Sequence, residues 1–486
     1  MTAQEPQYGG TLIYADRLDV TSIDPQVSNE IPIIYAFSEG LTSLGDNGEI
    51  KPFLASEWEA SENATTYTFT IRDGVMFHNG RQMVGEDVVW AVERTINPDT
   101  AAFRGNSLAG VSVELVDDMT VRLTSPTPNA ALPALLASTF IIAPESANED
   151  GSITEPIGTG PFMIEEWIPG QEMRLVRHEN YWREELPYLD GLTYQIIADP
   201  TAALNALRSD TIDLSPINAT DLPLALQDDS LVVEPAVLNI YGHFTFNLNQ
   251  PQPPLDDVRV RRAIAIALNK SDLLTITVGE DGPGNINNQM YDEGDFWRMD
   301  VEDNFVEGDL DAARALLEEA GVADGFETSI LTWADGRPAA EVLQATLAQL
   351  NITAEIIFAT DFPTYRDTLL GYEYGILLDS AFPREDPSAY MTLWECDDPS
   401  NFFRAGHCNP EVDAFLETGL SISDPDARRD AYASALDILY NQEVVSVIYL
   451  TRKQIWGIQD GVTGFSVGTG KLNRVDGGIA ETWLSE

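Results

Sequence analysis

The feature that most constrains the fold is an alternation of helical and strand-like patterns between Asp256 and Phe358. Apolar residues recur at helical spacing in 258–268, 310–320 and 340–350, whereas 329–333 and 354–358 are short runs of β-forming residues. Asp309 suits the N-cap of the second helix, and Gly321 suits the position after its C-terminus. Strands that alternate with helices in this way predict a parallel sheet covered by helices.

The rest of the chain adds further strands and helices around this core. The patterns predict strands at 10–15, 67–72, 192–197, 239–247 and 444–450, and helices at 86–95, 201–207 and 424–440. A chain of 486 residues is too long for one compact core, so we expect two or three domains. We find no internal repeat.

The charge excludes two classes of partner. The chain has 79 acidic and 27 basic residues, a net charge of −52, and only four of the basic residues are lysines. Nucleic acid and anionic membrane surfaces would both be repelled. Such a surface is either simply very soluble or adapted to high salt, where mutual repulsion is screened. We favour salt adaptation, because lysine is depleted as well as outnumbered.

No membrane-spanning segment is expected. The most apolar stretch, 130–144, is too short to cross a bilayer and contains a proline. The first six residues lack the features of a signal peptide. By composition alone the chain is either cytosolic or a mature form with an added methionine.

The sequence carries no recognisable catalytic motif. We find no Gly-x-Ser-x-Gly, no phosphate-binding loop, no dinucleotide fingerprint and no His-Glu-x-x-His. The four histidines are too scattered to predict a zinc site. We therefore expect no catalytic residues, no metal and no cofactor, although a hydrolase that uses two carboxylates stays open.

The two cysteines, Cys396 and Cys408, are separated by eleven residues. His407 adjoins Cys408, so an incomplete Cys/His metal pair is one interpretation. In a secreted protein a local disulfide is the favoured one.

An ordered series of short motifs runs through nearly the whole chain. Together they resemble family 5 extracellular solute-binding proteins, which serve importers of dipeptides, oligopeptides, nickel, opines and some oligosaccharides. The matching segments are YGGTL at 8–12, SEGL at 38–41, PFLASEW at 52–58, YTFTIRDGVMFHNG at 67–80, PIGTGPF at 156–162, NYW at 180–182, PLDDVRVRRAIAIALN at 254–269 and NPEVD at 409–413.

The resemblance implies a periplasmic-binding-protein-like type II α/β fold, with two lobes, a hinge and an inserted domain. Lobe I would comprise 1–44, 157–248 and 460–486, the inserted domain 45–156, and lobe II 249–459. The implied function is the binding subunit of an ABC importer. It would capture a peptide or amino-acid-derived molecule between the lobes, as a periplasmic or extracellular, cell-surface monomer that delivers to a membrane permease.

The resemblance also implies where ligand binds. The implied contacts are Asn29, Tyr241, His243, Asn247, Trp333, Arg337, Asp379, Phe382, Arg384 and Trp394. Peptide-binding members often place an aspartate where this chain has Pro383, so dipeptide recognition would need another acid, such as Asp379. Arg384 offers a fork for a carboxylate or phosphate; alternatively it is a surface residue paired with Glu385 or Asp386.

Within the family, an oligosaccharide, an opine or a metal chelate is the alternative ligand. Trp333 and Trp394 would stack on a ligand ring or pack in the core. An enzyme of unknown type is the alternative outside the family.

Overall fold

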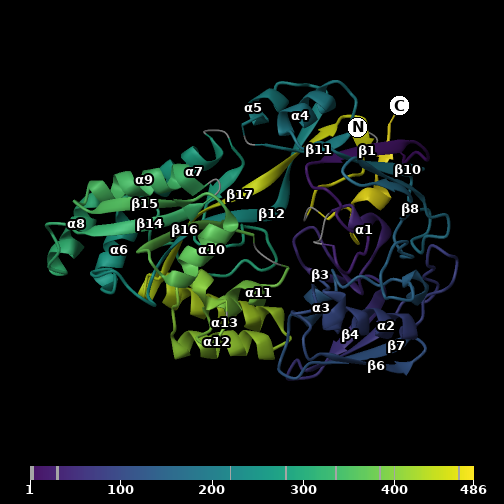
Figure 1. Ribbon diagram of the computed structural model, residues 1–486, viewed down its shortest axis with the longest axis horizontal. Coiled ribbons are helices and arrows are strands. Elements are labelled where there is room, and N and C mark those ends of the chain that lie inside the picture. The colour runs from purple at the N-terminus through teal and green to yellow at the C-terminus, as the bar shows by residue number, and fades with distance from the viewer. Residues whose placement is uncertain are drawn as a thin grey trace. The chain divides into compact units, whose positions relative to one another are not determined.

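The computed structural model describes residues 5–28, 32–218, 220–279, 282–333, 336–382, 385–398, 400–468 and 471–485, apart from the side chains of 237–239 and 402. The chain divides into two compact units: unit 1 is Met1–Leu238 with Gln454–Glu486, and unit 2 is Asn239–Lys453. Both boundaries fall inside long strands, β12 (Leu231–Phe246) and β17 (Ser446–Gln459), which therefore connect the units (Figure 1). The predicted three-part division stays a prediction.

The main sheet of unit 1 is built around β1 (Thr11–Asp16). β1 pairs in parallel with β10 (Gly191–Ile196) and with β11 (Leu214–Ile217), and the strand order is β17-β11-β1-β10-β9-β8. Its core includes Tyr14, Tyr194 and Trp456. The remaining elements on this sheet or beside it are α1 (Ile34–Phe37), β8 (Phe162–Ile168), β9 (Glu172–Arg177), α4 (Pro200–Arg208), α5 (Leu222–Ala225), β18 (Val462–Thr463), η7 (Ile479–Glu481) and β19 (Trp483–Leu484).

A second sheet in unit 1 has its own hydrophobic core. Four antiparallel strands in the order β4-β5-β7-β6 pack against α2 (Gly85–Ile96). All four lie within the predicted insertion, 45–156. The elements of this part are β2 (Thr42–Leu44), β3 (Ile50–Pro52), β4 (Ala55–Ala60), β5 (Thr66–Ile71), η1 (Pro98–Thr100), β6 (Ser112–Asp117), β7 (Thr120–Thr124), α3 (Leu132–Leu135) and η2 (Pro144–Ser146).

The sheet of unit 2 has the strand order β15-β14-β16-β12-β17, with β13 beside β17. β14 (Glu327–Trp333) pairs in parallel with β15 (Thr353–Ala359) and β16 (Ile376–Ala381), while β12 runs antiparallel to β16. The predicted parallel, helix-covered sheet is thus confirmed. The other elements are α6 (Val258–Ala267), α7 (Lys270–Val278), β13 (Gly284–Ile286), α8 (Leu310–Glu319), α9 (Arg337–Ala348), α10 (Phe362–Gly371), α11 (Ser388–Met391), η4 (Thr392–Trp394), η5 (Asn401–Arg404), α12 (Pro410–Ser421), α13 (Pro425–Asp437) and the π-helix η6 (Ile438–Gln442).

The two faces of this sheet pack against different helices. Leu378 of β16 joins a core formed with α6, α7, α8 and α9. Its neighbour Leu377 points the other way and packs with Tyr365 and Leu369 of α10. Because side chains alternate along a strand, Asp379 lies on the α10 face with Leu377. The paired helices α12 and α13 follow this region in the chain (Figure 1).

Local sequence signals explain several element ends. The Asp309 side chain accepts hydrogen bonds from the amides of Asp311 and Ala312, and so caps α8 as predicted. Gly321 follows this helix with a φ of +78°, the left-handed conformation that glycine adopts without strain.

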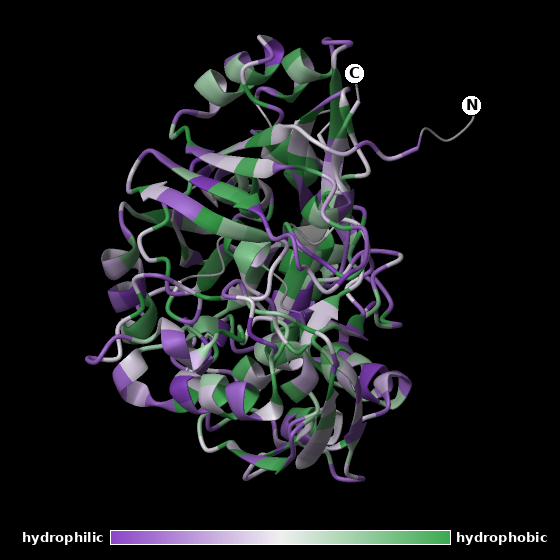
Figure 2. Cartoon of the chain, turned by 90° about the vertical axis from the view of Figure 1, so that its right-hand side faces the viewer, coloured by the Kyte–Doolittle hydropathy of each residue, from purple (hydrophilic) through white to green (hydrophobic). Residues whose placement is uncertain are grey.

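Hydrophobic residues are concentrated on the strands, whereas the outer helices and loops carry many hydrophilic ones (Figure 2). Within the described ranges, no helix combines the length and apolar character needed to cross a membrane.

Candidate functional site

In open α/β sheets, ligands bind beside the carboxyl ends of the parallel strands. The sheet of unit 2 has such an end. β14, β15 and β16 all end at the same edge, at Trp333, Ala359 and Ala381. The one carboxylate that β16 carries to this edge is Asp379, which belongs to the predicted contact set. We therefore built the candidate site outward from Asp379.

The Asp379 carboxylate is held by three donors. The Tyr365 hydroxyl donates to Oδ2 at 2.5 Å, and the backbone amide of Ser380 donates to Oδ1 at 2.8 Å. The Trp333 indole also points at Oδ1, at 3.3 Å. Burial raises the pKa of Asp379 above its ordinary value, while these hydrogen bonds and the charge of Arg404 act in the opposite direction. The result is an oriented acid with a perturbed pKa, as is common at functional sites.

Aromatic rings surround this acid. The rings of Trp333 and Tyr365 stack with centroids 5.2 Å apart, and Phe362 lies 5.5 Å from Trp333. Phe362 is 45% exposed, so part of this aromatic surface is open to solvent; Phe382, which follows β16, is 62% exposed. A carboxylate flanked by aromatic rings suits an ammonium group attached to an apolar body.

A second cluster lies beside Asp379 on the same face of the sheet. His243 of β12 is the register partner of Asp379, and Tyr241 is the partner of Ala381. The guanidinium of Arg404 lies over the rings of Tyr390 and Trp394, at 4.9 and 5.4 Å. The predicted residues Tyr241, His243, Trp333, Asp379 and Trp394 are thus brought to one face.

His243 is held as a neutral imidazole. It is 3% exposed, and its Nδ1 lies 3.1 Å from the Thr245 hydroxyl. Burial lowers the pKa of His243 well below its ordinary value, and the positive charge of Arg404 lowers it further. Asp379 and Arg404, in contrast, can each carry a charge on this face.

Other predicted contacts lie apart or have internal partners. The Asn247 amide donates to the carbonyls of Tyr372 and Tyr374, both at 2.8 Å, and its oxygen accepts from the amides of Asn249 and Gln250. These bonds use all four of its hydrogen-bonding positions, so Asn247 braces the backbone. Asn29 and Arg384, like Pro383, lie outside the described residues.

Arg337 stands at the start of α9. It pairs with Glu341 at 3.1 Å and lies 5.4 Å from the Phe358 ring. Both members of this ion pair are more than half exposed, so the pair contributes little to stability.

The segment after Asp379 is anchored by a buried ion pair. Arg428 donates to both oxygens of Asp386 at 2.7 Å, and both side chains are 5% exposed or less. Ser388 also donates to Asp386 from its amide and its hydroxyl. Arg428 and Ser388 therefore hold Asp386 within unit 2.

Cys396 and Cys408 form a disulfide, with sulfurs 2.15 Å apart. The loop between them contains η5, and Arg404 is the last residue of η5. Asn401 braces the loop from inside, because its amide donates to the carbonyls of Glu395 and His407 at 2.9 and 3.0 Å. His407 lies 2.7 Å from a carboxylate oxygen of Glu443.

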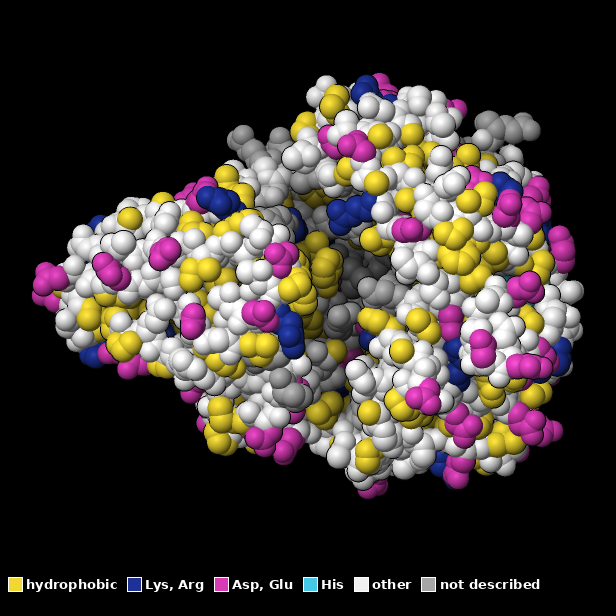
Figure 3. Space-filling view, viewed as in Figure 1, with side chains coloured by type: hydrophobic (Ala, Val, Ile, Leu, Met, Phe, Trp, Pro, Cys, Tyr) yellow, Lys and Arg dark blue, Asp and Glu magenta, His cyan; other side chains and the backbone are white. Residues whose placement is uncertain are grey.

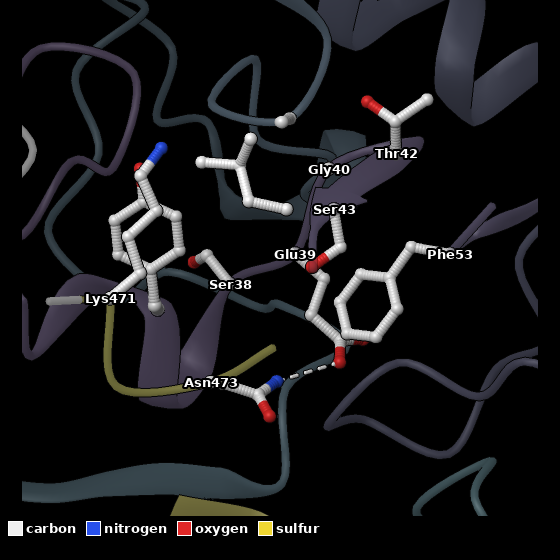
Figure 4. Close-up of a pocket in the computed structure, with 11 residues that line it drawn as sticks. Ser38, Glu39, Gly40, Thr42, Ser43, Phe53, Lys471 and Asn473 are labelled. Carbon is white, nitrogen blue, oxygen red and sulfur yellow. Dashed lines mark hydrogen bonds between the residues drawn. The ribbon is translucent and has the colours of Figure 1, made fainter. Parts of the chain in front are cut away.

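Two small hollows occur within the units. In unit 2, on the opposite face of the sheet, Gly242, Thr277, Ser380 and Arg452 help to line about 310 Å³ of space not filled by atoms. In unit 1, a hollow of about 260 Å³ surrounds Glu39, and Figure 4 shows the Asn473 amide pointing at the Glu39 carboxylate.

The Glu39 carboxylate accepts from four donors: Thr159, Tyr181, Trp182 and Asn473, at 2.7 to 2.9 Å. Burial raises the pKa of Glu39 to about 6, although these hydrogen bonds act to lower it. Because both oxygens are occupied, Glu39 links segments of unit 1.

No group of three or more histidine, cysteine, aspartate or glutamate side chains in the described part of the chain is arranged to hold a metal ion.

The model of one protein family matches residues 49–402, nearly three quarters of the chain: bacterial extracellular solute-binding proteins, family 5. The chain belongs to this family. The family predicted from the sequence motifs is thereby confirmed.

The relatives are named as binding proteins. A glutathione-binding protein of Salmonella paratyphi A is 28% identical over 476 residues, which cover 92% of this chain and 90% of the relative. A dipeptide-binding protein of Escherichia coli is 27% identical with the same coverage. HbpA2 from Haemophilus parasuis has a solved structure with a TM-score of 0.85 at 22% identity, covering 98% of this chain and all of that one. This likeness confirms the periplasmic-binding-protein-like type II α/β fold.

Sequence reasoning missed three residues of the site: Tyr365, Tyr390 and Arg404. Arg404 carried one usable signal, because it is the only arginine or lysine between the two cysteines. Tyr365 and Tyr390 carried none that distinguishes them from core tyrosines.

Proposed function

We propose that this solute-binding protein is the substrate-binding subunit of an ABC-type importer and captures a short peptide or amino-acid-derived molecule through its free amine. The observation that carries this proposal is the Asp379 carboxylate, which hydrogen bonds from the stacked side chains of Trp333 and Tyr365 orient. The carboxylate would pair with the ammonium group, and the rings would cover the adjoining apolar part. Asp379 would replace the acid that peptide-binding members often carry at the position of Pro383.

The relatives support the ligand class. Their names include a glutathione-binding and a dipeptide-binding protein, and one solved structure of the same fold is a dipeptide-binding protein in complex with Met-Leu. Glutathione and dipeptides both carry a free amine and at least one carboxylate.

The setting of the protein follows from the family. We propose that the chain works outside the cytoplasm, at the cell surface or in the periplasm, as a monomer that delivers ligand to a membrane permease. It would bind without catalysis and without a cofactor. Lobe I (1–44, 157–248 and 460–486), the insertion (45–156) and lobe II (249–459) stay our proposed division.

The remaining contacts belong to the same proposal. We place Asn29, Tyr241, His243, Trp333, Phe382 and Arg384 among the groups that meet the ligand, with Arg384 on a carboxylate or phosphate. The contacts made by Asn247 and Arg337 favour bracing roles for them.

A thermal-shift experiment tests the role of Asp379. Ligand that binds the folded state raises the melting temperature in proportion to the logarithm of its affinity. We expect L-methionyl-L-leucine to stabilise the wild type and to stabilise Asp379→Asn far less, because a buried ligand charge would lose its partner. Asp324→Asn is the matched control, since Asp324 is an exposed acid of unit 2. Equal stabilisation of all three proteins would contradict the proposal.

A further inference from the structure

The environment of Arg404 is unusual for a charged side chain. Arg404 is only 5% exposed, and its guanidinium lies over the rings of Tyr390 and Trp394. Its hydrogen bonds with described residues are two long ones, to the Tyr241 hydroxyl at 3.3 Å and to the carbonyl of Phe403 at 3.4 Å. The Nε of Arg404 is buried, with no hydrogen-bond partner among the described residues.

Among the described residues, Arg404 has no counter-ion. No carboxylate in the described ranges pairs with it, whereas Arg428 of the same unit, equally buried, holds both oxygens of Asp386. A buried charge without a partner is costly, and most buried arginines are paired or saturated with hydrogen bonds. Arg404 therefore has unused capacity to attract an anion.

The charge of Arg404 reaches Asp379. This charge acts to lower the pKa of Asp379 and the pKa of His243, which is the register partner of Asp379 on the neighbouring strand. Arg404 and Asp379 thus influence each other on the same face, and no ion pair joins these two side chains. A ligand with only an ammonium group would be attracted by Asp379 and repelled by Arg404. A ligand that also carries a carboxylate would compensate both charges.

The loop that carries Arg404 is built to hold it in place. The disulfide between Cys396 and Cys408 closes this loop, and Asn401 braces it from inside. A charge held in a fixed position costs little reorganisation when ligand binds.

We infer that Arg404 is a specificity-determining residue, which makes the site prefer ligands with a free carboxylate in addition to the amine, such as an unblocked short peptide. This inference rests on the proposed function and names its ligand class more closely. Arg404 would act by its charge, as a buried positive centre facing the ligand.

Calorimetric titration with L-methionyl-L-leucine and with its carboxy-terminal amide tests this inference. We expect the wild type to bind the free acid at least about tenfold more tightly than the amide, and Arg404→Gln to bind the two about equally. Arg404→Lys keeps the charge and should keep most of the preference. Arg366→Gln is the matched control: Arg366 is an exposed arginine of α10, and its loss should leave the ratio unchanged.

The outcomes separate the two proposals. If the wild type binds neither form, the proposed function is wrong and the inference falls with it. If the wild type binds both forms equally, or if folded Arg404→Gln keeps the preference, or if Arg404→Lys loses it, the inference alone is wrong. Equal wild-type affinities for the free acid and the amide would contradict the inference even if Arg404→Gln does not fold.

Discussion

The position of Asp379 and the hydrogen bonds to its carboxylate determine what this residue can bind. Its position at the end of β16 puts the carboxylate at the sheet edge, and the Tyr365 hydroxyl fixes its orientation from α10. Burial raises the pKa of Asp379, so its carboxyl takes up a proton at a higher pH than an ordinary aspartate. Affinity for an amine should accordingly fall on mild acidification, because only the ionised carboxylate pairs with ammonium.

The hydrogen bond from Tyr365 gives a test of this pH dependence. The bond lowers the pKa of Asp379, so Tyr365→Phe should raise that pKa and shift the acid limb of ligand affinity to higher pH. We expect the pH at which affinity for L-methionyl-L-leucine falls to half its maximum to be higher in Tyr365→Phe than in the wild type.

The control for this prediction is Tyr374→Phe. Tyr374 is buried in the same cluster, and its hydroxyl makes no hydrogen bond with the described residues. Titrations at several pH values should separate the two variants. Superimposable pH profiles for both variants and the wild type would count against a role for Tyr365.

Single residues were predictable where a strand end or a family motif located them. Trp333 ends a strand that the sequence pattern predicts, whereas Asp379 was named from the family resemblance; the structure brings them within hydrogen-bonding distance. Arg404 and Tyr365 were not predictable, because their roles depend on contacts made in three dimensions. Arg404, for example, meets Tyr241 across 163 positions of sequence.

The disulfide that closes the loop between Cys396 and Cys408 should affect both the stability of the protein and its affinity for ligand. Its cysteines are 12 positions apart, and cross-linking a loop of this length stabilises a protein by about 3 kcal/mol in the chain-entropy model. We expect the double variant Cys396→Ser/Cys408→Ser to unfold at lower denaturant concentration. It should also bind L-methionyl-L-leucine more weakly, because Arg404 would lose its fixed position. A variant less stable than the wild type but with unchanged affinity would separate the disulfide from the site.

The raised pKa of Glu39 predicts how the free energy of unfolding of unit 1 depends on pH. Its pKa rises from an ordinary 4.5 to about 6 in the folded protein, so the folded state holds this proton more tightly than the unfolded one. The resulting stabilisation is fully present below pH 4.5 and is lost as pH rises through 6. It amounts to about 2 kcal/mol for a shift of 1.5 units.

Denaturant unfolding of the wild type and Glu39→Gln across pH 4.5 to 7 measures this contribution. Other carboxyls titrate in the same range, so the difference between the two curves is the informative quantity. The variant should be less stable throughout, with the gap widest at low pH. Parallel curves would show that Glu39 has an ordinary pKa.

The sequence predicted most elements but not the length of the two connecting strands. The strand predicted at 239–247 is the end of β12, which begins at Leu231, and the strand predicted at 444–450 continues to Gln459. Pro235 interrupts the first pattern, and the polar run from Thr451 to Gln454 interrupts the second. Both strands continue because neighbouring strands pair with them. A local sequence pattern does not reveal such pairing.

The acidic composition acts at the scale of the whole molecule. Carboxylates are scattered over the visible surface of each unit (Figure 3), and the net charge is −52. Self-repulsion of this size destabilises the compact state at low ionic strength, while at 1 M salt the screening length falls to about 3 Å. We propose that the protein is adapted to high salt.

Thermal unfolding in KCl tests the proposed salt adaptation. We expect the melting temperature to rise by about 10 °C or more between 0.1 and 2 M KCl, since screening relieves repulsion in the folded state. Sucrose at matched osmolality is the control, because it stabilises proteins without screening charge. A melting temperature that responds equally to both solutes, or to neither, would contradict salt adaptation.

The central claim is that this family 5 protein binds a small molecule through a free amine. The most direct measurement is calorimetric titration of the wild-type protein with L-methionyl-L-leucine and with its N-acetyl derivative. We expect saturable binding of the free dipeptide with a dissociation constant of about 1 μM or below, and affinity for the acetylated form at least about tenfold weaker. Equal binding of the two forms, or binding of neither, would contradict it.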